Sequence, residues 1–194
     1  MIIKDWKKEI LTIPNLLSLF RLLLIPVYVV IYVNAKDASG YYLSAAILAI
    51  SCLTDMIDGK IARHFDMVTA IGKILDPLAD KATQFTMIIC LSIKHPVIHS
   101  LIVLFVIKEG FQLIAGSINL KHGKMLKGAL LSGKICTTVL FVSLIIMVML
   151  PDLTSKIITI ITVIDLIFML VAFLDYIITY ANKSSRFQYI DETP

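Results

Sequence analysis

Four aspartates at helical spacing are the residues of this chain best suited to chemistry. Asp55 and Asp58 are three residues apart, and Asp76 and Asp80 are four apart, so each pair projects from one face of a helix. Paired carboxylates supply the oxygen ligands that Mg²⁺ and Mn²⁺ prefer, and such ions often complete their coordination with phosphate oxygens. The pattern therefore predicts a site for two divalent ions that acts on a phosphoryl group.

The residues around the carboxylates suit the same chemistry. Gly59, Ala62 and Gly72 keep their helix faces small, where a substrate must approach the backbone. Arg63 adds a permanently charged guanidinium, which suits a phosphate. Structural roles stay open for all four, because small residues in membrane helices usually serve packing and a terminal arginine usually anchors its helix.

The chain that carries these carboxylates is strongly apolar. Of its 194 residues, 58% are hydrophobic, and the mean hydropathy is +0.89; ordinary soluble domains have roughly 45 to 50% apolar residues. A charged side chain near the bilayer centre costs roughly 2.5 to 3.5 kcal/mol, so four aspartates there need cations, water or polar partners. The composition predicts an all-α integral membrane protein.

Six apolar segments are long enough to cross about 30 Å of hydrocarbon. They are Asn15–Asn34, Tyr41–Arg63, Thr69–Ile93, Val97–Leu120, Ala129–Leu150 and Ser155–Tyr180. Residues 1–12 mix lysines with Trp6 and aliphatic side chains, which indicates a short amphipathic helix in the membrane interface. The expected organisation is this interfacial segment, a six-helix transmembrane domain over residues 13–181 and a polar tail over residues 182–194.

The basic residues of the loops predict the orientation of the bundle. One side of the predicted membrane domain has only Lys36, Lys94 and Lys156, and the other side carries the remaining loop lysines and arginines. Both termini and the carboxylate site are therefore expected to be cytoplasmic. The net charge of +4 is small and spread along one face, which favours membrane lipids and argues against nucleic acid as a partner. The three cysteines lack the spacing of a zinc site or a disulfide framework.

The aspartates belong to a longer pattern of fixed spacing. Its eight positions span 26 residues: Asp55, Asp58, Gly59, Ala62, Arg63, Gly72, Asp76 and Asp80. This pattern resembles the signature of the CDP-alcohol phosphatidyltransferase family. The similarity extends to Asn15 and Arg21 near the start of the chain and to the six-helix layout.

The resemblance implies an enzyme that transfers the phosphatidyl group of CDP-diacylglycerol to an alcohol and releases CMP. It implies that Asp55, Asp58 and Asp76 bind two Mg²⁺ or Mn²⁺ ions, and that Asp80 is the catalytic base and an additional ligand. Substrate binding would fall to the neighbouring residues of the pattern and of the first segment: Gly59, Ala62, Arg63, Gly72, Asn15 and Arg21. The resemblance also implies a homodimer.

The acceptor alcohol stays open. The amino-terminal pattern is most similar to family members that use glycerol 3-phosphate and make phosphatidylglycerophosphate. In those members basic residues are expected where this chain has Gly116 and Cys136. CMP-forming cardiolipin synthesis from phosphatidylglycerol is therefore the alternative, and inositol phosphate and serine have less support. Lys108 and Lys134 are the remaining candidates for binding an acceptor phosphate, although Lys108 and Glu109 equally suit a pair that fixes packing.

A divalent-cation transporter is an alternative of another class, since channels also contain intramembrane carboxylates. A conduction path needs polar groups through the full membrane. The acidic residues of the second and third segments stop at about half depth by the helical rise of about 1.5 Å per residue. Dependence on a cytidine nucleotide would distinguish the enzyme from the transporter.

Overall fold

The structure is a computed structural model that describes residues 12–64, 69, 72–122, 124–126, 128, 130–182 and 187–189. It describes the backbone alone at 13, 14, 55–64, 73, 74, 124, 125 and 187–189. The predicted interfacial helix therefore lies outside the described residues except at Thr12. The chain forms two compact units. Unit 1 contains the residues up to Lys94 together with Leu144–Asp152, and unit 2 contains His95–Ser143 and the residues from Leu153 onward.

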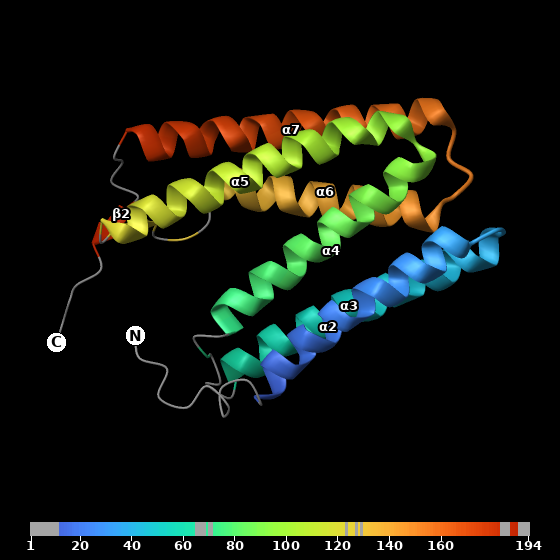
Figure 1. Cartoon of the computed structure of the whole chain (residues 1–194), viewed down its shortest axis with the longest axis horizontal. Helices are drawn as coiled ribbons and strands as arrows, with labels where there is room; N and C mark the ends of the chain where they lie inside the picture. The colour runs from blue at the N-terminus through green and yellow to red at the C-terminus, as the bar shows by residue number, and fades with distance from the viewer. Residues whose placement is uncertain are drawn as a thin grey trace. The chain divides into compact units, whose positions relative to one another are not determined.

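Unit 1 contains three long helices, α2 (Ile13–Asn34), α3 (Ala38–His64) and α4 (Gly72–Lys94), and α2 packs against the other two (Figure 1). A proline in the first turn of α2 is tolerated because its missing N–H has no helical partner there. Before α3, Asp37 accepts hydrogen bonds from the Ser39 hydroxyl (2.8 Å) and the Gly40 N–H (3.1 Å). These bonds hold the pKa of Asp37 below its ordinary value and cap the start of α3.

Contacts at the two ends of α2 fix the directions of its neighbours. At one end, Asn15 hydrogen-bonds Thr69, shortly before α4 begins. At the other end, Tyr32 lies edge to face with Tyr41, with 5.4 Å between ring centroids, and the Lys94 ammonium lies 3.8 Å from the centroid of the Tyr41 ring. The helices α2 and α4 therefore run in the same direction, and α3 runs back between their ends.

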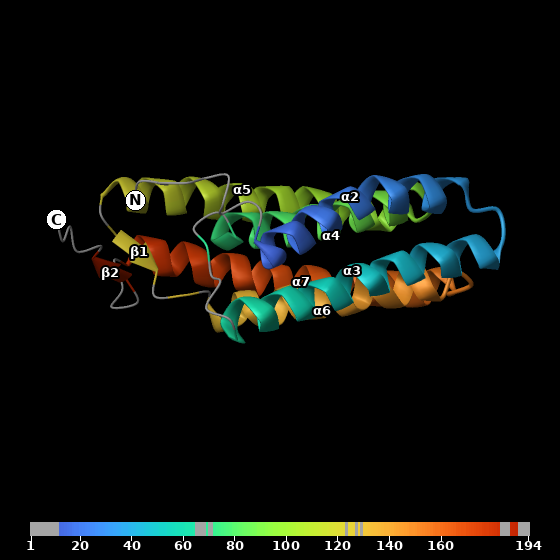
Figure 2. The same ribbon diagram turned by 90° about the horizontal axis from the view of Figure 1, so that it is seen from below.

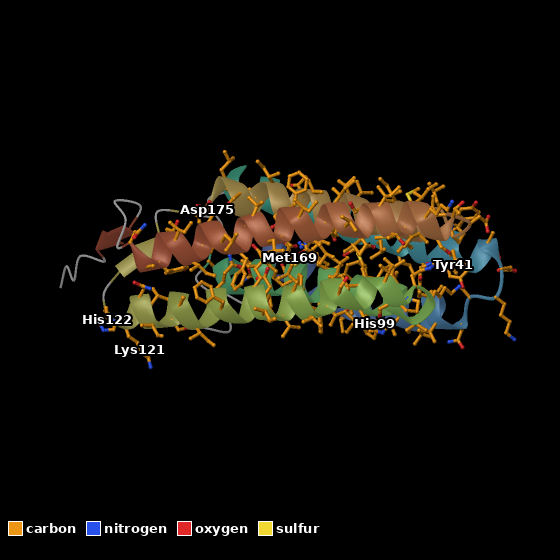
Figure 3. All side chains as sticks on the ribbon, turned by 90° about the horizontal axis from the view of Figure 1, so that it is seen from above. Tyr41, His99, Lys121, His122, Met169 and Asp175 are labelled. Atoms are coloured by element: carbon orange, nitrogen blue, oxygen red, sulfur yellow. The ribbon has the colours of Figure 1, made fainter. Side chains whose placement is uncertain are left out.

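Unit 2 contains the short 3₁₀ helix η1 (Pro96–Ile98), α5 (His99–Lys121), α7 (Ser155–Ala181) and the part of α6 (Leu131–Met149) up to Ser143. The helices α5 and α7 pack together, and Met169, which is 1% exposed, lies between their ribbons in Figure 3.

Two short strands complete unit 2. The strand β1 (Lys124–Leu126) follows α5, and β2 (Phe187–Tyr189) follows α7; they form an antiparallel ribbon beside the end of α5 (Figure 2). Met125 is paired with Gln188 in this register. This ribbon was not predicted from the sequence, because three-residue strands contain too few residues for an alternating pattern.

The prediction of a helical membrane protein is confirmed at the level of individual helices. Among the described residues, four helical stretches are long and apolar enough to cross a membrane: Asn15–Asn34, Pro96–Lys121, Leu131–Met149 and Ser155–Ala181. The expected second and third spans form the helices α3 and α4, but only Ala38–Thr54 of that region counts as a shorter apolar helix. The side chains of α3 are described only as far as Thr54, and α4 contains Asp76, Asp80 and Lys81 among its apolar residues, so the six-span count stays a prediction.

The exposed surface of the described helices is strongly apolar, and several polar side chains are buried beside apolar core residues such as Met87 and Ile88. Large aliphatic side chains are mostly exposed on the helices, as at Leu23 (68%), Leu113 (71%) and Leu131 (73%). Polar side chains such as Asn15 and Lys108 are buried. Soluble monomers rarely expose apolar surface on this scale. This arrangement suits a lipid environment, in which apolar side chains face the hydrocarbon.

Candidate functional site

A row of three polar residues on α2 forms one side of the site. Asn15, Ser18 and Arg21 follow one another at intervals of three residues, so they lie on one helix face. Their exposures are only 1%, 0% and 2%. Polar groups buried in this way need hydrogen-bond partners. All three find them in or just before α4.

Two of these contacts reach the aspartates of α4. The Ser18 hydroxyl donates a hydrogen bond of 2.5 Å to Oδ1 of Asp76. One turn further along both helices, the Arg21 guanidinium forms an ion pair with Oδ1 of Asp80. The side chain of Asp80 nevertheless keeps 47% of its surface exposed. Both carboxylates are therefore held from α2, and Asp80 is still accessible to a further partner.

The third contact organises the start of α4. The Asn15 amide donates to the Thr69 hydroxyl oxygen (2.9 Å), and the same oxygen accepts a hydrogen bond from the Gly72 N–H (2.9 Å). A Cβ on Gly72 would lie 2.6 Å from Oδ1 of Asn15 and 3.1 Å from Oγ1 of Thr69. Glycine at this position thus permits the close approach of α2. The substrate-binding role that the sequence predicts for Asn15, Arg21 and Gly72 stays a prediction.

The other five positions of the predicted motif lie on α3. Asp55, Asp58, Gly59, Ala62 and Arg63 are all within this helix, but their side chains lie outside the described residues. Among the residues whose side chains are described, no group of three or more His, Cys, Asp or Glu side chains is placed to hold a metal ion. The described donors, Asp76 and Asp80, are hard oxygen ligands of the kind that Mg²⁺ or Mn²⁺ prefers. Asp76 and Asp80 are two of the four predicted ligands, and their chemistry fits such an ion.

The two residues predicted to bind the acceptor are in unit 2 and differ in burial. Lys108 is buried, with its ammonium 2.6 Å from Oε1 of Glu109 and 3.5 Å from Oε1 of Gln112. Lys134, in the first turn of α6, is exposed. The structure thus contains the ion pair that was the alternative interpretation of Lys108.

Ser18 and Thr69 take part in the contacts that connect α2 with α4 and with a residue shortly before it, but neither was predicted from the sequence. Ser18 lies midway between Asn15 and Arg21, both of which were predicted site residues, so the spacing of three contained the signal. A serine in an apolar helix, however, usually bonds its own helix. Thr69 carries no such signal, because its partner Asn15 is 54 residues away.

Comparison with known proteins gives a family. A family model described as CDP-alcohol phosphatidyltransferase matches residues 11–178. A curated protein of Aquifex aeolicus named CDP-diacylglycerol--glycerol-3-phosphate 3-phosphatidyltransferase is 33% identical over 171 residues, which are 86% of this chain and 94% of the relative.

Two other relatives match over shorter stretches, and the chain spans less than half the length of each. A protein of Wigglesworthia glossinidia brevipalpis with the same name is 39% identical over 71 residues, or 37% of this chain and 38% of the relative. A cardiolipin synthase (CMP-forming) / mitochondrial hydrolase fusion protein of Schizosaccharomyces pombe is 41% identical over 91 residues, or 46% of this chain and 14% of the relative. Because the family model and the Aquifex relative both extend over most of the sequence, the chain belongs to the CDP-alcohol phosphatidyltransferase family.

Proposed function

We propose that this protein transfers the phosphatidyl group of CDP-diacylglycerol to an alcohol acceptor and releases CMP. The observation that carries this proposal is the pair of α4 carboxylates, Asp76 and Asp80, held by α2 with Asp80 nearly half exposed. The family assignment supplies the substrate class for that pair. The Aquifex relative, of which 94% is matched, bears the name of such a transferase.

The helix contacts in unit 1 support a shared metal site of four aspartates. Tyr41 on α3 and Lys94 on α4 are in contact, so these two residues mark the same height along the two helices. Counting from there, Asp55 is 14 residues along α3 and Asp80 is 14 residues along α4. Both distances correspond to about 21 Å of helical rise. We therefore propose that Asp55 and Asp58 complete the site begun by Asp76 and Asp80.

The residues of the site have distinct proposed roles. When bound, Mg²⁺ or Mn²⁺ supplies charge neutralisation at the diphosphate and at the departing CMP. Arg21 holds the Asp80 carboxylate in place through their ion pair. Gly59, Ala62, Arg63 and Gly72 are proposed to contact the CDP moiety, as the family pattern implies.

In the proposed step, Asp80 takes the proton of the acceptor hydroxyl. The hydroxyl oxygen forms a bond to the phosphorus that carries the diacylglycerol. The bond from this phosphorus to the bridging oxygen of the diphosphate breaks, and its electron pair leaves with CMP. The products are a phosphatidyl ester of the acceptor, CMP and a protonated Asp80.

We propose glycerol 3-phosphate as the acceptor. The support is the name of the Aquifex relative, because this chain matches 94% of that relative. Cardiolipin synthesis from phosphatidylglycerol is the second candidate, because Gly116 and Cys136 stand where basic residues were expected and one relative is named for that activity. The pairing of Lys108 with Glu109 also lowers the positive charge that Lys108 offers an anionic acceptor.

The proposed arrangement in the membrane follows from the same residues. We propose six spans, in which α3 and α4 cross the bilayer in addition to the four apolar helices. Both termini and the carboxylates would then lie on the cytoplasmic side, where the loops are rich in lysine and arginine. The family resemblance further suggests a homodimer.

The deciding experiment measures CMP release by the purified full chain with CDP-diacylglycerol and Mg²⁺. Glycerol 3-phosphate, phosphatidylglycerol, inositol phosphate and serine are compared as acceptors, and EDTA removes the metal. Release that requires both metal and one acceptor establishes the transfer and identifies the product. No release with any acceptor, together with flux of Mg²⁺ or Mn²⁺ into vesicles containing the protein, would favour a transporter.

A further inference from the structure

Several helix hydroxyl groups in the described part of the chain donate to their own helix, and the Ser18 hydroxyl reaches a carboxylate of a neighbouring helix. Ser44, Thr83, Ser92 and Thr137 each donate to a carbonyl three or four residues earlier in their own helix, at 2.7 to 2.8 Å. This is the usual way to satisfy a hydroxyl in an apolar helix. The Ser18 hydroxyl donates to a carboxylate oxygen of another helix, Oδ1 of Asp76, at 2.5 Å.

We propose that Ser18 is a positioning residue for the metal ligand Asp76. Its hydroxyl fixes the orientation of the Asp76 carboxylate, so that the remaining oxygen lone pairs point toward a divalent cation. This inference rests on the proposed function, which makes Asp76 a ligand.

The physical basis is the rotational freedom of an aspartate. The terminal torsion of an aspartate is broad, and an ionised carboxylate has about four lone-pair sites on its two oxygens. A hydrogen bond to a charged acceptor is roughly twice as strong as one between neutral groups. Ser18 is 0% exposed, so water does not compete for its hydrogen bond to Asp76. The carboxylate is thereby held in one orientation before an ion arrives.

The contacts on either side of Ser18 make this role separable from helix packing. Asn15 holds the start of α4 through Thr69, and Arg21 holds Asp80. These two contacts stay in place when the hydroxyl of Ser18 is removed. The variant Ser18→Ala should therefore keep α2 against α4 and lose only the orientation of Asp76.

Unit 2 offers a matched control. The Ser132 hydroxyl on α6 donates to Oδ2 of Asp175 on α7, also at 2.5 Å. This is the same pair of residue types joined across two helices, outside the predicted metal site. Ser132→Ala removes an equivalent hydrogen bond, so it reports what such a loss does to the protein in general.

The test measures the binding of Mn²⁺ alone to the full chain in detergent, through the electron paramagnetic resonance signal of the free ion. Loss of a group that orients a metal ligand typically weakens metal binding by about 10- to 100-fold. We expect a loss of this size for Ser18→Ala, near wild-type affinity for Ser18→Thr, which keeps the hydroxyl, and no change for Ser132→Ala. Should Ser18→Ala fail to fold, Ser18→Cys keeps the shape with a weaker donor and should bind Mn²⁺ less tightly than wild type.

Three results would overturn the inference: equal affinity of Ser18→Ala and wild type, an equal loss in Ser132→Ala, or no Mn²⁺ binding by the wild-type protein. CMP release, measured on the same samples, separates the two proposals. Weakened Mn²⁺ binding in Ser18→Ala, with no CMP release by the wild type for any acceptor, would leave Ser18 as a positioning residue and reject the proposed transfer.

Discussion

Each unit contains an ion pair, and the two pairs differ in where the partner lies and in how exposed the carboxylate is. In unit 1, polar side chains of α2 reach across to the carboxylates of α4, and Asp80 keeps 47% of its side-chain surface exposed. In unit 2, Lys108 pairs with Glu109, its neighbour on the same helix, and the side chains of this pair are only 4% and 17% exposed. The ion pair of unit 1 leaves its carboxylate accessible to a further partner, whereas the ion pair of unit 2 shields its carboxylate.

This difference indicates which charged groups are available for chemistry. A buried pair that satisfies itself contributes to packing, and removing one partner is costly. A carboxylate held by a neighbour but left nearly half exposed can also contact a substrate or an ion. Burial alone would have ranked Lys108 above Asp80 as a functional residue. Exposure and pairing together reverse that order.

The largest expected effect comes from Asp80→Asn in unit 1. The asparagine amide cannot take the proton of the acceptor alcohol's hydroxyl, so CMP release should fall by about 10² to 10⁴-fold. Asp175→Asn in unit 2 is the control, because it neutralises an aspartate that, like Asp80, is contacted by a side chain of a neighbouring helix. Initial rates with CDP-diacylglycerol and the active acceptor measure both. Comparable losses in the two variants would remove the functional distinction between the units.

The ion pair of unit 2 should show the next largest effect, in stability. Lys108→Met removes the cation that contacts the nearly buried Glu109 carboxylate, and such a loss costs about 3 kcal/mol. The double variant Lys108→Met/Glu109→Gln should recover most of that loss, because the buried charge is gone. Thermal unfolding in detergent measures both. If the double variant is as unstable as Lys108→Met, the loss of stability does not come from the unpaired charge of Glu109.

Alanine substitutions at two glycines, one in each unit, should change the stability of the protein in opposite directions. Gly72→Ala in unit 1 should destabilise the protein by about 1 to 3 kcal/mol, because its Cβ would lie 2.6 Å from Oδ1 of Asn15. Gly110→Ala in α5 should stabilise it by about 0.5 to 1 kcal/mol, because nothing lies within 4 Å of the added Cβ. Unfolding midpoints measure both changes.

A second variant at Asn15 checks the cause of the Gly72 effect. Adding Asn15→Ala to Gly72→Ala should cost less than the sum of the two single changes, since the clash disappears with the amide. Strict additivity would show that Asn15 is not the group that excludes a side chain at residue 72.

The smallest expected effect is that of Asp37→Asn, at the exposed start of α3. Hydrogen bonds from Ser39 and Gly40 lower the pKa of Asp37, so its charged form contributes stability above the ordinary value of 3.8. That contribution is lost as the pH falls through the lowered pKa. Wild type should unfold at a slightly higher temperature than the variant at pH 7, with the gap narrowing at pH 3. A gap that widens on acidification would contradict the role of the charge.

The lengths of the helices were predictable from the sequence, because apolar runs in a membrane protein are bounded by charged and turn residues. The expected segment Ser155–Tyr180 corresponds to α7 at Ser155–Ala181, and the expected Val97–Leu120 corresponds to α5 at His99–Lys121. The β1–β2 ribbon was not predictable, because its two strands are far apart in the sequence and each is too short to show an alternating pattern.

The carboxylates of the candidate site were predictable, whereas their supporting contacts were not. The spacing of Asp76 and Asp80 identifies them as one face of a helix whatever surrounds them. That Ser18 contacts Asp76 depends on how α2 lies against α4, across 58 residues of sequence. A single sequence contains no direct information on such a contact. The side chains of Asp55 and Asp58 lie outside the described residues, so their place in the site stays a prediction.

The Thr69 hydroxyl has a consequence for how the protein assembles. One oxygen both accepts the Gly72 N–H, as a helix-capping group does, and accepts the Asn15 amide of α2. Each bond orients the hydroxyl for the other, so formation of the first turn of α4 and docking of α2 are cooperative. During synthesis α2 is made before α4, so a docking partner is already present when this turn forms. The aspartates that follow in α4 therefore gain their positions in the same step that joins the two helices.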